Sequence, residues 1–230
     1  MGTRSVVLRG APRCERCGMP HRWCICAGER SVSCGVAVDV LIHQREAWRP
    51  TSTGRLIHRV VAGTRLHVFR PEEPTVESAV RRPERALWVL HPRGAALDEA
   101  RAELEPAGPG PQVVLLDGSW REAATMIRAA ERWGRLVNLP MTGPSRYRLR
   151  GQLEAGHYST VEALLFLLAA LGESAAHAGL ERQFELHVYA GLRARGDKAG
   201  AEAFLATTRL AEEMPEMLAE LNRRRARDDN

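Results

Sequence analysis

A carboxylate, a glycine and a hydroxyl follow an apolar run in the middle of the chain. Residues 113–116 are Val-Val-Leu-Leu, and directly after them come Asp117, Gly118, Ser119 and Trp120. Four consecutive apolar residues that end at turn-forming residues are typical of a parallel strand buried on both faces. In open α/β sheets, ligands bind at the carboxyl edge of such strands. We therefore expect Asp117 to lie at a ligand-binding edge.

The residues after Asp117 have the pattern of a helix start. Ser119 is a suitable N-cap, and Glu122, three residues later, completes a capping box. Apolar side chains then recur at helical spacing, which predicts a helix over 119–133. Trp120, in its first turn, could stack on a ligand ring or pack the helix start against the sheet. Asp117 could move a proton or could serve only as a helix-start carboxylate.

Four of the five cysteines are crowded into a short segment near the N-terminus. They follow the pattern C-x2-C-x6-C-x-C, at Cys14, Cys17, Cys24 and Cys26. Four thiolates this close can surround one tetrahedral zinc ion, which would fold a segment too polar to build a core. Disulfides are the alternative, disfavoured because no secretory signal is evident, and His21 could replace one cysteine. We expect a structural zinc knuckle, with Cys34 as a small core residue.

The positive charge is concentrated in the N-terminal third of the chain. Residues 1–70 contain 12 arginines and 4 acidic residues, a balance of +8, whereas the remaining 21 basic and 24 acidic residues give −3. A one-sided basic region is the expected footprint of a protein that binds a polyanion, and nucleic acid is the leading candidate. The candidate contacts around the knuckle are Arg13, Arg16, Arg22 and Arg30.

Alternating strand and helix patterns follow the cysteine segment and predict an α/β fold, with a parallel sheet and flanking helices. The expected strands are 36–42, 64–69, 86–90, 112–116 and 135–139. The expected helices are 53–61, 97–104, 119–133, 159–171 and 175–192, with further helix at 199–221. We expect three segments, which are a basic zinc knuckle at 1–32, a catalytic domain at 33–195, and a helical extension with a basic tail at 196–230.

Four loops rich in polar and small residues leave the carboxyl ends of the expected strands. They span 43–54, 91–94, 117–120 and 139–150. The last of them leads into a helix start at Ser159 and Thr160, where free N–H groups could hold the carboxylate of a ligand. Glu162, in the first turn, could belong to this site or only complement the helix dipole.

Length and composition limit the class of protein. A chain of 230 residues with 44% apolar residues can bury a sizeable core, which excludes a largely disordered protein. The longest apolar run, 163–171, is too short to span a bilayer, and no hydrophobic core follows Arg4 and Arg9. We therefore expect a cytoplasmic protein without a membrane partner. Neither a G-x-G-x-x-G pattern nor a P-loop predicts a dinucleotide or triphosphate site.

Five motifs, taken in order, resemble the DTW-domain family of tRNA-uridine aminocarboxypropyltransferases. They are the cysteine pattern, His43-x-Arg45-Glu46 with Thr53-Gly54-Arg55-Leu56, Asp117-Gly-Ser-Trp120, Tyr147-Arg-Leu-Arg150 and Ser159-Thr-Val-Glu-Ala163. The resemblance covers roughly residues 13–192. The chain departs from the family's D-x-T-W pattern at Ser119, which keeps the hydroxyl and lacks the methyl group. The loop that begins at His91 matches less well.

The resemblance implies a SPOUT-like fold with a C-terminal trefoil knot. The implied reaction moves the 3-amino-3-carboxypropyl group of S-adenosylmethionine, the co-substrate, to N3 of a uridine in tRNA and releases methylthioadenosine. Asp117 would then be the base for the N3 proton, with Ser119 and Trp120 beside it. The co-substrate pocket would be formed by Asp117 with Leu90, Pro92, Leu139, Pro140, Tyr147, Leu149, Ser159, Thr160 and Glu162. The anions would be held by Arg45, Arg55, Arg148 and Arg150.

Two other functions fit the same residues. A SPOUT-type RNA methyltransferase would use the same fold and co-substrate but transfer the methyl group. A non-catalytic zinc-knuckle protein would only bind the nucleotide. Basic patches contact phosphates and do not read the base sequence, so these residues do not distinguish a tRNA acceptor from ribosomal RNA. They also leave open a monomer or a homodimer.

Overall fold

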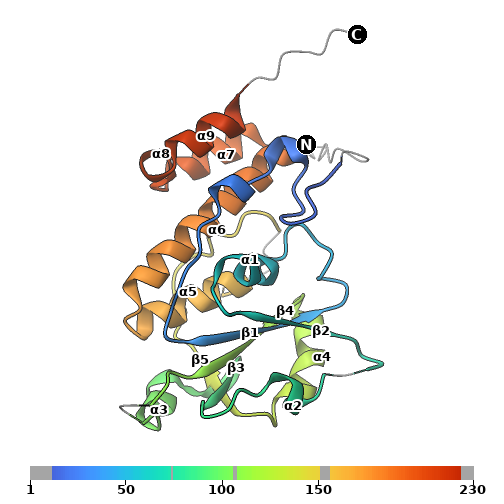
Figure 1. Cartoon of the computed structure of the whole chain (residues 1–230), viewed down its shortest axis with the longest axis vertical. Helices are drawn as coiled ribbons and strands as arrows, with labels where there is room; N and C mark the ends of the chain where they lie inside the picture. Colours follow the sequence, from blue (N-terminus) through green and yellow to red (C-terminus); the bar gives the residue numbers. More distant parts are fainter. Residues whose placement is uncertain (1–11, 74, 106–107, 151–155, 224–230) are drawn as a thin grey trace. The chain divides into compact units, whose positions relative to one another are not determined.

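A five-stranded parallel sheet organises the middle of the chain. The computed structural model describes residues 12–73, 75–105, 108–150 and 156–223 (Figure 1). The strand order is β2-β1-β4-β3-β5, and all pairs are parallel. The strands are β1 (Ala37–His43), β2 (Arg65–Phe69), β3 (Leu87–Ala96), β4 (Gln112–Asp117) and β5 (Arg135–Asn138). The α/β class, the five strands and their parallel arrangement are therefore confirmed.

Helices cover both faces of this sheet. They are α1 (Thr53–Val60), α2 (Glu77–Val80), α3 (Leu97–Ala102), α4 (Trp120–Ala130) and α5 (Thr160–Ala170). Helices α1 and α5 contact each other and β4, whereas α4 lies on the opposite face (Figure 1). On the α4 face, Val114 of β4 packs with Met126 and Ile127 in one buried cluster. Because β4 is covered on both faces, its apolar run is explained by burial.

The described chain divides into two compact units, residues 30–181 and residues 12–29 with 182–223. The second unit contains most of α6 (Ser174–Ala194), together with α7 (Lys198–Leu205), α8 (Leu210–Glu213) and α9 (Pro215–Asn222). Within it, Arg22 donates hydrogen bonds to the carbonyls of Leu221 and Arg223, at 2.6 and 2.7 Å. The cysteine segment and the last helix are therefore tied together. The limits expected for three functional segments, 1–32, 33–195 and 196–230, stay predictions.

Some elements differ from the sequence prediction. The helix expected over 199–221 is three short helices, because the hydroxyls of Thr207 and Thr208 bond the last carbonyls of α7 and Pro215 begins α9. The four-residue α2 was not predicted. Strand β3 continues past Leu90 through an irregularity to Ala96. In the described residues, no helix is long and apolar enough to cross a membrane. The trefoil knot stays a prediction.

Candidate functional site

Asp117 lies at the carboxyl end of β4 and is almost completely buried. Its Oδ2 accepts a hydrogen bond of 2.7 Å from the Ser52 hydroxyl, and its Oδ1 accepts one of 2.6 Å from the Thr160 hydroxyl. Ser52 is the N-cap of α1, and its Oγ also accepts from the backbone N–H of Arg55. Thr160 is the first residue of α5. One carboxylate therefore joins the starts of two helices.

Gly54 completes this arrangement because no larger residue fits. A Cβ built on Gly54 would lie 2.6 Å from Cγ of Asp117. This close approach allows the Gly54 backbone N–H to bond the carboxylate. We call Asp117, Ser52, Thr160 and Gly54 the carboxylate clamp.

Burial raises the pKa of Asp117, and the hydrogen bonds from Thr160, Ser52 and Gly54 offset that effect only in part. A raised pKa makes the ionised carboxylate a stronger base than an exposed aspartate. Both carboxylate oxygens, however, already accept a hydroxyl. A proton can therefore reach Asp117 through one of these hydroxyl partners.

A largely apolar cavity opens at the carboxyl ends of β3, β4 and β5. It encloses about 910 Å³, counting the part open to solvent. Six residues predicted for the site line it, namely Leu90, Pro92, Trp120, Leu139, Ser159 and Thr160. Asp117 is not a lining residue, but Thr160 belongs to both the cavity wall and the carboxylate clamp. Thr160 therefore connects the cavity wall with the buried carboxylate.

The start of α4 forms one wall of the cavity. Ser119 and Glu122 form the predicted capping box, with the Ser119 N–H donating to the Glu122 carboxylate at 2.8 Å. The Trp120 ring is 47% exposed, and its centroid lies 4.5 Å from that of His157. Trp120 therefore presents its ring at the cavity wall instead of packing under the helix. His43, at the end of β1, contacts the other Glu122 oxygen at 3.3 Å.

Glu162 fastens a loop to the start of α5. Its carboxylate accepts hydrogen bonds from the Ser145 hydroxyl at 2.9 Å and from the backbone N–H of Arg146 and Ser159, at 2.6 and 2.7 Å. This network shapes the loop that borders the cavity, so Glu162 does more than complement the helix dipole.

Three other residues predicted for the pocket lie outside its wall. Tyr147 and Leu149 are buried, and the Tyr147 hydroxyl donates to the carbonyl of Thr51 at 2.5 Å. Pro140 is exposed. Their proposed contacts with the co-substrate stay predictions.

The predicted anion-binding arginines have different surroundings. Arg150 forms an ion pair with the buried Glu46, which also pairs with Arg49 at 3.0 Å. Arg55 lies in the first turn of α1. Arg45 and Arg148 are exposed. The structure thus gives Arg150 an internal role and leaves Arg45 at the surface.

The arginines of the cysteine segment also differ in the contacts that they make. Arg13 donates to the carbonyl of Gly18 at 3.0 Å, and Arg16 pairs with Glu29 at 2.8 Å. The Arg22 guanidinium lies 4.4 Å from the centre of the Trp23 ring, in addition to its bonds to the last helix. Arg30 is exposed.

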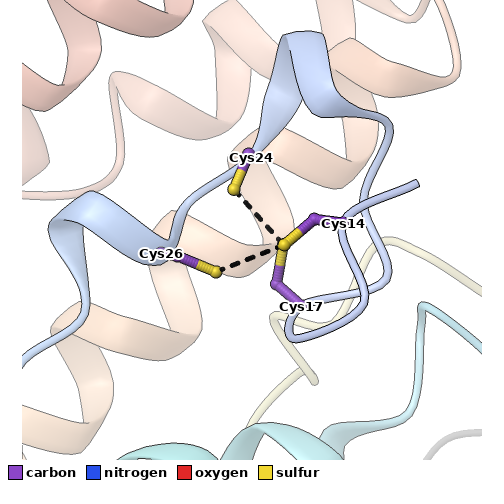
Figure 2. A group of neighbouring side chains, drawn as sticks. All are labelled: Cys14, Cys17, Cys24 and Cys26. Atoms are coloured by element: carbon purple, nitrogen blue, oxygen red, sulfur yellow. Dashed lines mark hydrogen bonds between the residues drawn. The ribbon is translucent and has the colours of Figure 1, made fainter. Parts of the chain in front are cut away.

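Four cysteine sulfurs converge in the second unit (Figure 2). The Sγ atoms of Cys14, Cys17, Cys24 and Cys26 all lie within 4.8 Å of one another, and no other residue type belongs to the group. All are free thiols, so the disulfide alternative is not what the structure has. Four soft sulfur donors in one cluster suit a closed tetrahedral zinc site, and His21 is not needed as a ligand. Cys34 lies apart, half-buried before β1.

Sequence reasoning missed Ser52, Met141 and Tyr158. Ser52 holds Asp117, and the other two line the cavity. The N-cap pattern before α1 was a visible signal for Ser52. No pattern marks Met141 or Tyr158, because only the folded loop brings them to the cavity.

Comparison with known proteins identifies the family of the chain. No solved structure matches the chain significantly. The sequence profile of the DTW domain matches residues 11–190, a segment that includes the cysteine cluster, the carboxylate clamp and the cavity. The chain therefore belongs to the DTW domain family, which is known in general for tRNA modification.

Proposed function

We propose that the chain transfers the 3-amino-3-carboxypropyl group of S-adenosylmethionine to N3 of a uridine in tRNA. In this reaction a bond forms between N3 and the chosen carbon, and the bond from that carbon to sulfur breaks. The electron pair of that bond stays on sulfur, which leaves as methylthioadenosine. The N3 proton goes to a base on the protein. The observation that carries the proposal is Thr160, a residue of the cavity wall whose hydroxyl bonds Asp117.

The cavity suits a co-substrate with an apolar ring system and a charged end. Apolar residues and the Trp120 ring would contact the adenine and ribose. The hydroxyls of Ser159 and Thr160, at the start of α5, would face the amino acid end, and the helix N-terminus favours its carboxylate.

The sulfonium activates all three attached carbons, so positioning decides which group is transferred. The reacting atoms must be held in line at about 3–3.5 Å. Rigid groups are needed for this, and the carboxylate clamp fixes the starts of α1 and α5 at the site. Glu162 fixes the loop of Ser145 in the same way.

Proton removal would pass through Thr160. Uracil N3 is a weak acid and must lose its proton during attack. The Thr160 hydroxyl can accept that proton while it donates its own to Oδ1 of Asp117, so the carboxylate acts as the base without lining the cavity. The raised pKa of Asp117, caused mainly by burial, suits this role.

The SPOUT-like superfamily relationship and tRNA as the acceptor are proposed from the family. A cytoplasmic location is proposed from the sequence, which contains no apolar run long enough to span a bilayer. Zinc held by the four cysteines would be structural and would stabilise the second unit.

One experiment separates this reaction from its rivals. The purified protein is incubated with unmodified tRNA and S-adenosylmethionine, and the digested nucleosides and small products are analysed by mass spectrometry. We expect aminocarboxypropyluridine and methylthioadenosine in equal amounts. Methyluridine with S-adenosylhomocysteine would instead indicate a methyltransferase. Binding of tRNA without either product would indicate an RNA-binding protein, and a parallel incubation with ribosomal RNA tests that acceptor.

A further inference from the structure

An exposed tryptophan lies in a groove outside the cavity. The groove is lined by Gln44, Arg45, Ala47, Trp48, Val68 and Arg70, and we call it the Trp48 groove. Trp48 is 85% exposed, more than Val76 at 60% or Trp120 at 47%, the other exposed large hydrophobic residues described. An indole ring exposed to water lacks the favourable free energy that its burial would supply.

The groove is built on a firmly held loop. The backbone N–H of Gln44 donates to the carbonyl of Phe69 at 2.9 Å, which joins the chain after β1 to the end of β2. The backbone N–H of Glu46 donates to the carbonyl of His43 at 2.8 Å, and the Glu46 side chain is buried between two arginines. Trp48 therefore projects from an ordered turn, so little conformational entropy would be lost when a ligand binds to it.

Two arginines line the same groove as Trp48. Arg45 and Arg70 are exposed, and neither forms a side-chain ion pair with any residue that the structure describes. The acidic residue nearest in sequence to Trp48 is Glu46, whose charge is already compensated by Arg49 and Arg150. Glu72 and Glu73 follow Arg70 and are exposed. The groove thus combines one aromatic face with two available guanidinium groups.

We propose that the Trp48 groove binds an unpaired nucleotide of the RNA substrate. The base would stack on Trp48, while Arg45 and Arg70 would contact the adjoining phosphates. Stacking platforms flanked by cations are the usual way in which proteins hold single-stranded nucleic acid without reading its sequence.

The location of the groove supports a nucleotide over another ligand. The groove follows the carboxyl ends of β1 and β2, at the same sheet edge as Asp117 at the end of β4. Strand β2 is two positions from β4, so the ends of these two strands are roughly 10 Å apart across the sheet. An RNA strand whose target uridine enters the cavity would pass the Trp48 groove with a nearby nucleotide. This inference rests on the proposed function for the identity of the RNA.

Binding measurements with labelled unmodified tRNA and with oligouridine, both without S-adenosylmethionine, test the groove directly. We expect Trp48→Ala to raise Kd by roughly 5- to 140-fold and Trp48→Phe to restore most of the affinity. Arg45→Gln and Arg70→Gln should weaken binding and reduce its salt dependence, by about one counterion each. Val76→Ala and Arg132→Gln are the matched controls, because each removes an exposed side chain of the same kind elsewhere.

The nucleotide-binding groove and the transfer reaction can each be overturned without the other. An unchanged Kd for Trp48→Ala would overturn the groove even if the wild-type protein forms aminocarboxypropyluridine. Conversely, loss of affinity in Trp48→Ala, with no modified nucleoside from the wild-type protein, would support the groove and overturn the transfer reaction. Circular dichroism of each variant confirms that the fold is unchanged, as expected for a side chain that is 85% exposed.

Discussion

The hydroxyl of Thr160 lies 2.6 Å from Oδ1 of Asp117, and Thr160 is at the same time a residue of the cavity wall. Among the contacts described, this hydrogen bond links the buried carboxylate to a residue that a bound substrate can touch. The Ser52 hydroxyl occupies the other carboxylate oxygen at 2.7 Å. The proposed chemistry and the fold of this sheet edge consequently both depend on the Asp117 side chain.

Thr160→Val removes the hydroxyl and keeps the shape of the side chain. We expect the rate of transfer to fall by about 10²- to 10⁴-fold, the usual contribution of proton transfer. The free energy of unfolding should fall by about 1–3 kcal/mol, because the buried carboxylate loses a donor. Thr160→Ser, which keeps the hydroxyl, is the control and should retain most activity. A Val variant with wild-type turnover would show that the proton does not pass through Thr160.

Asp117 should set the acidic limb of the pH profile. Because burial raises its pKa above the ordinary value of 3.8, kcat/KM should increase with pH until Asp117 is ionised and then level off. Asp117→Asn should abolish most activity together with this limb. A variant that keeps both would show that Asp117 is not the base.

The same shift affects stability in a defined direction. A carboxyl group with a raised folded-state pKa contributes stability that is present below its unfolded pKa and is lost as pH rises through the folded pKa. The stability of the wild-type protein relative to Asp117→Asn should therefore decline as the pH rises above about 4. Denaturant unfolding of both proteins at several pH values measures this difference. A constant difference would argue against the raised pKa.

Asp39 should behave in the opposite way at lower pH. Burial would raise its pKa, but hydrogen bonds from His67, Arg65 and Arg82 outweigh burial and lower it from 3.8 to about 2. The resulting stability, about 2 kcal/mol, should be lost as pH falls from about 4 to about 2. Asp39→Asn should flatten acid unfolding in this window, whereas exposed Asp98→Asn should not.

Gly54→Ala tests the close approach within the carboxylate clamp. The new Cβ would meet Asp117 Cγ at 2.6 Å, so we expect a loss of about 1–3 kcal/mol in the free energy of unfolding. In an Asp117→Gly background the clash is absent, and the same substitution should cost much less. Denaturant unfolding measures the loss of unfolding free energy in each background. Equal losses would show that the strain does not come from the contact with Asp117.

The cysteine cluster should bind one zinc ion for each chain. Cys14→Ser should lower the zinc content measured by elemental analysis, whereas Cys34→Ser, outside the cluster, should leave it unchanged. Because metal binding contributes to folding, a chelator should destabilise the unit that contains residues 12–29. A folded, metal-free protein of wild-type stability would remove the structural role.

The sequence predicted the framework well because local patterns determine it. The apolar run before Asp117 and the capping box of Ser119 and Glu122 are both present as expected. These signals depend on neighbours within a few residues. The same is true of the four cysteines, whose spacing predicted their convergence.

The carboxylate clamp was not predictable in this way. Ser52 and Asp117 are 65 residues apart, and Thr160 is 43 residues further along than Asp117. Only the strand order brings them together. The pairing of Glu46 with Arg150 was hidden for the same reason, and the expected contact of Arg150 with an anion of the substrate stays a prediction.

The carboxylate clamp also has a consequence for how the protein folds. Asp117 takes one donor from a segment that precedes it and another from a segment that follows it, so neither contact can form by local collapse. Closing such long loops is slow, and until both are closed a buried carboxylate would lack its donors. A partly folded chain therefore gains little from assembling half of this edge. The edge should form late and all at once, so that a molecule with an incomplete site is also an incompletely folded one, open to proteolysis.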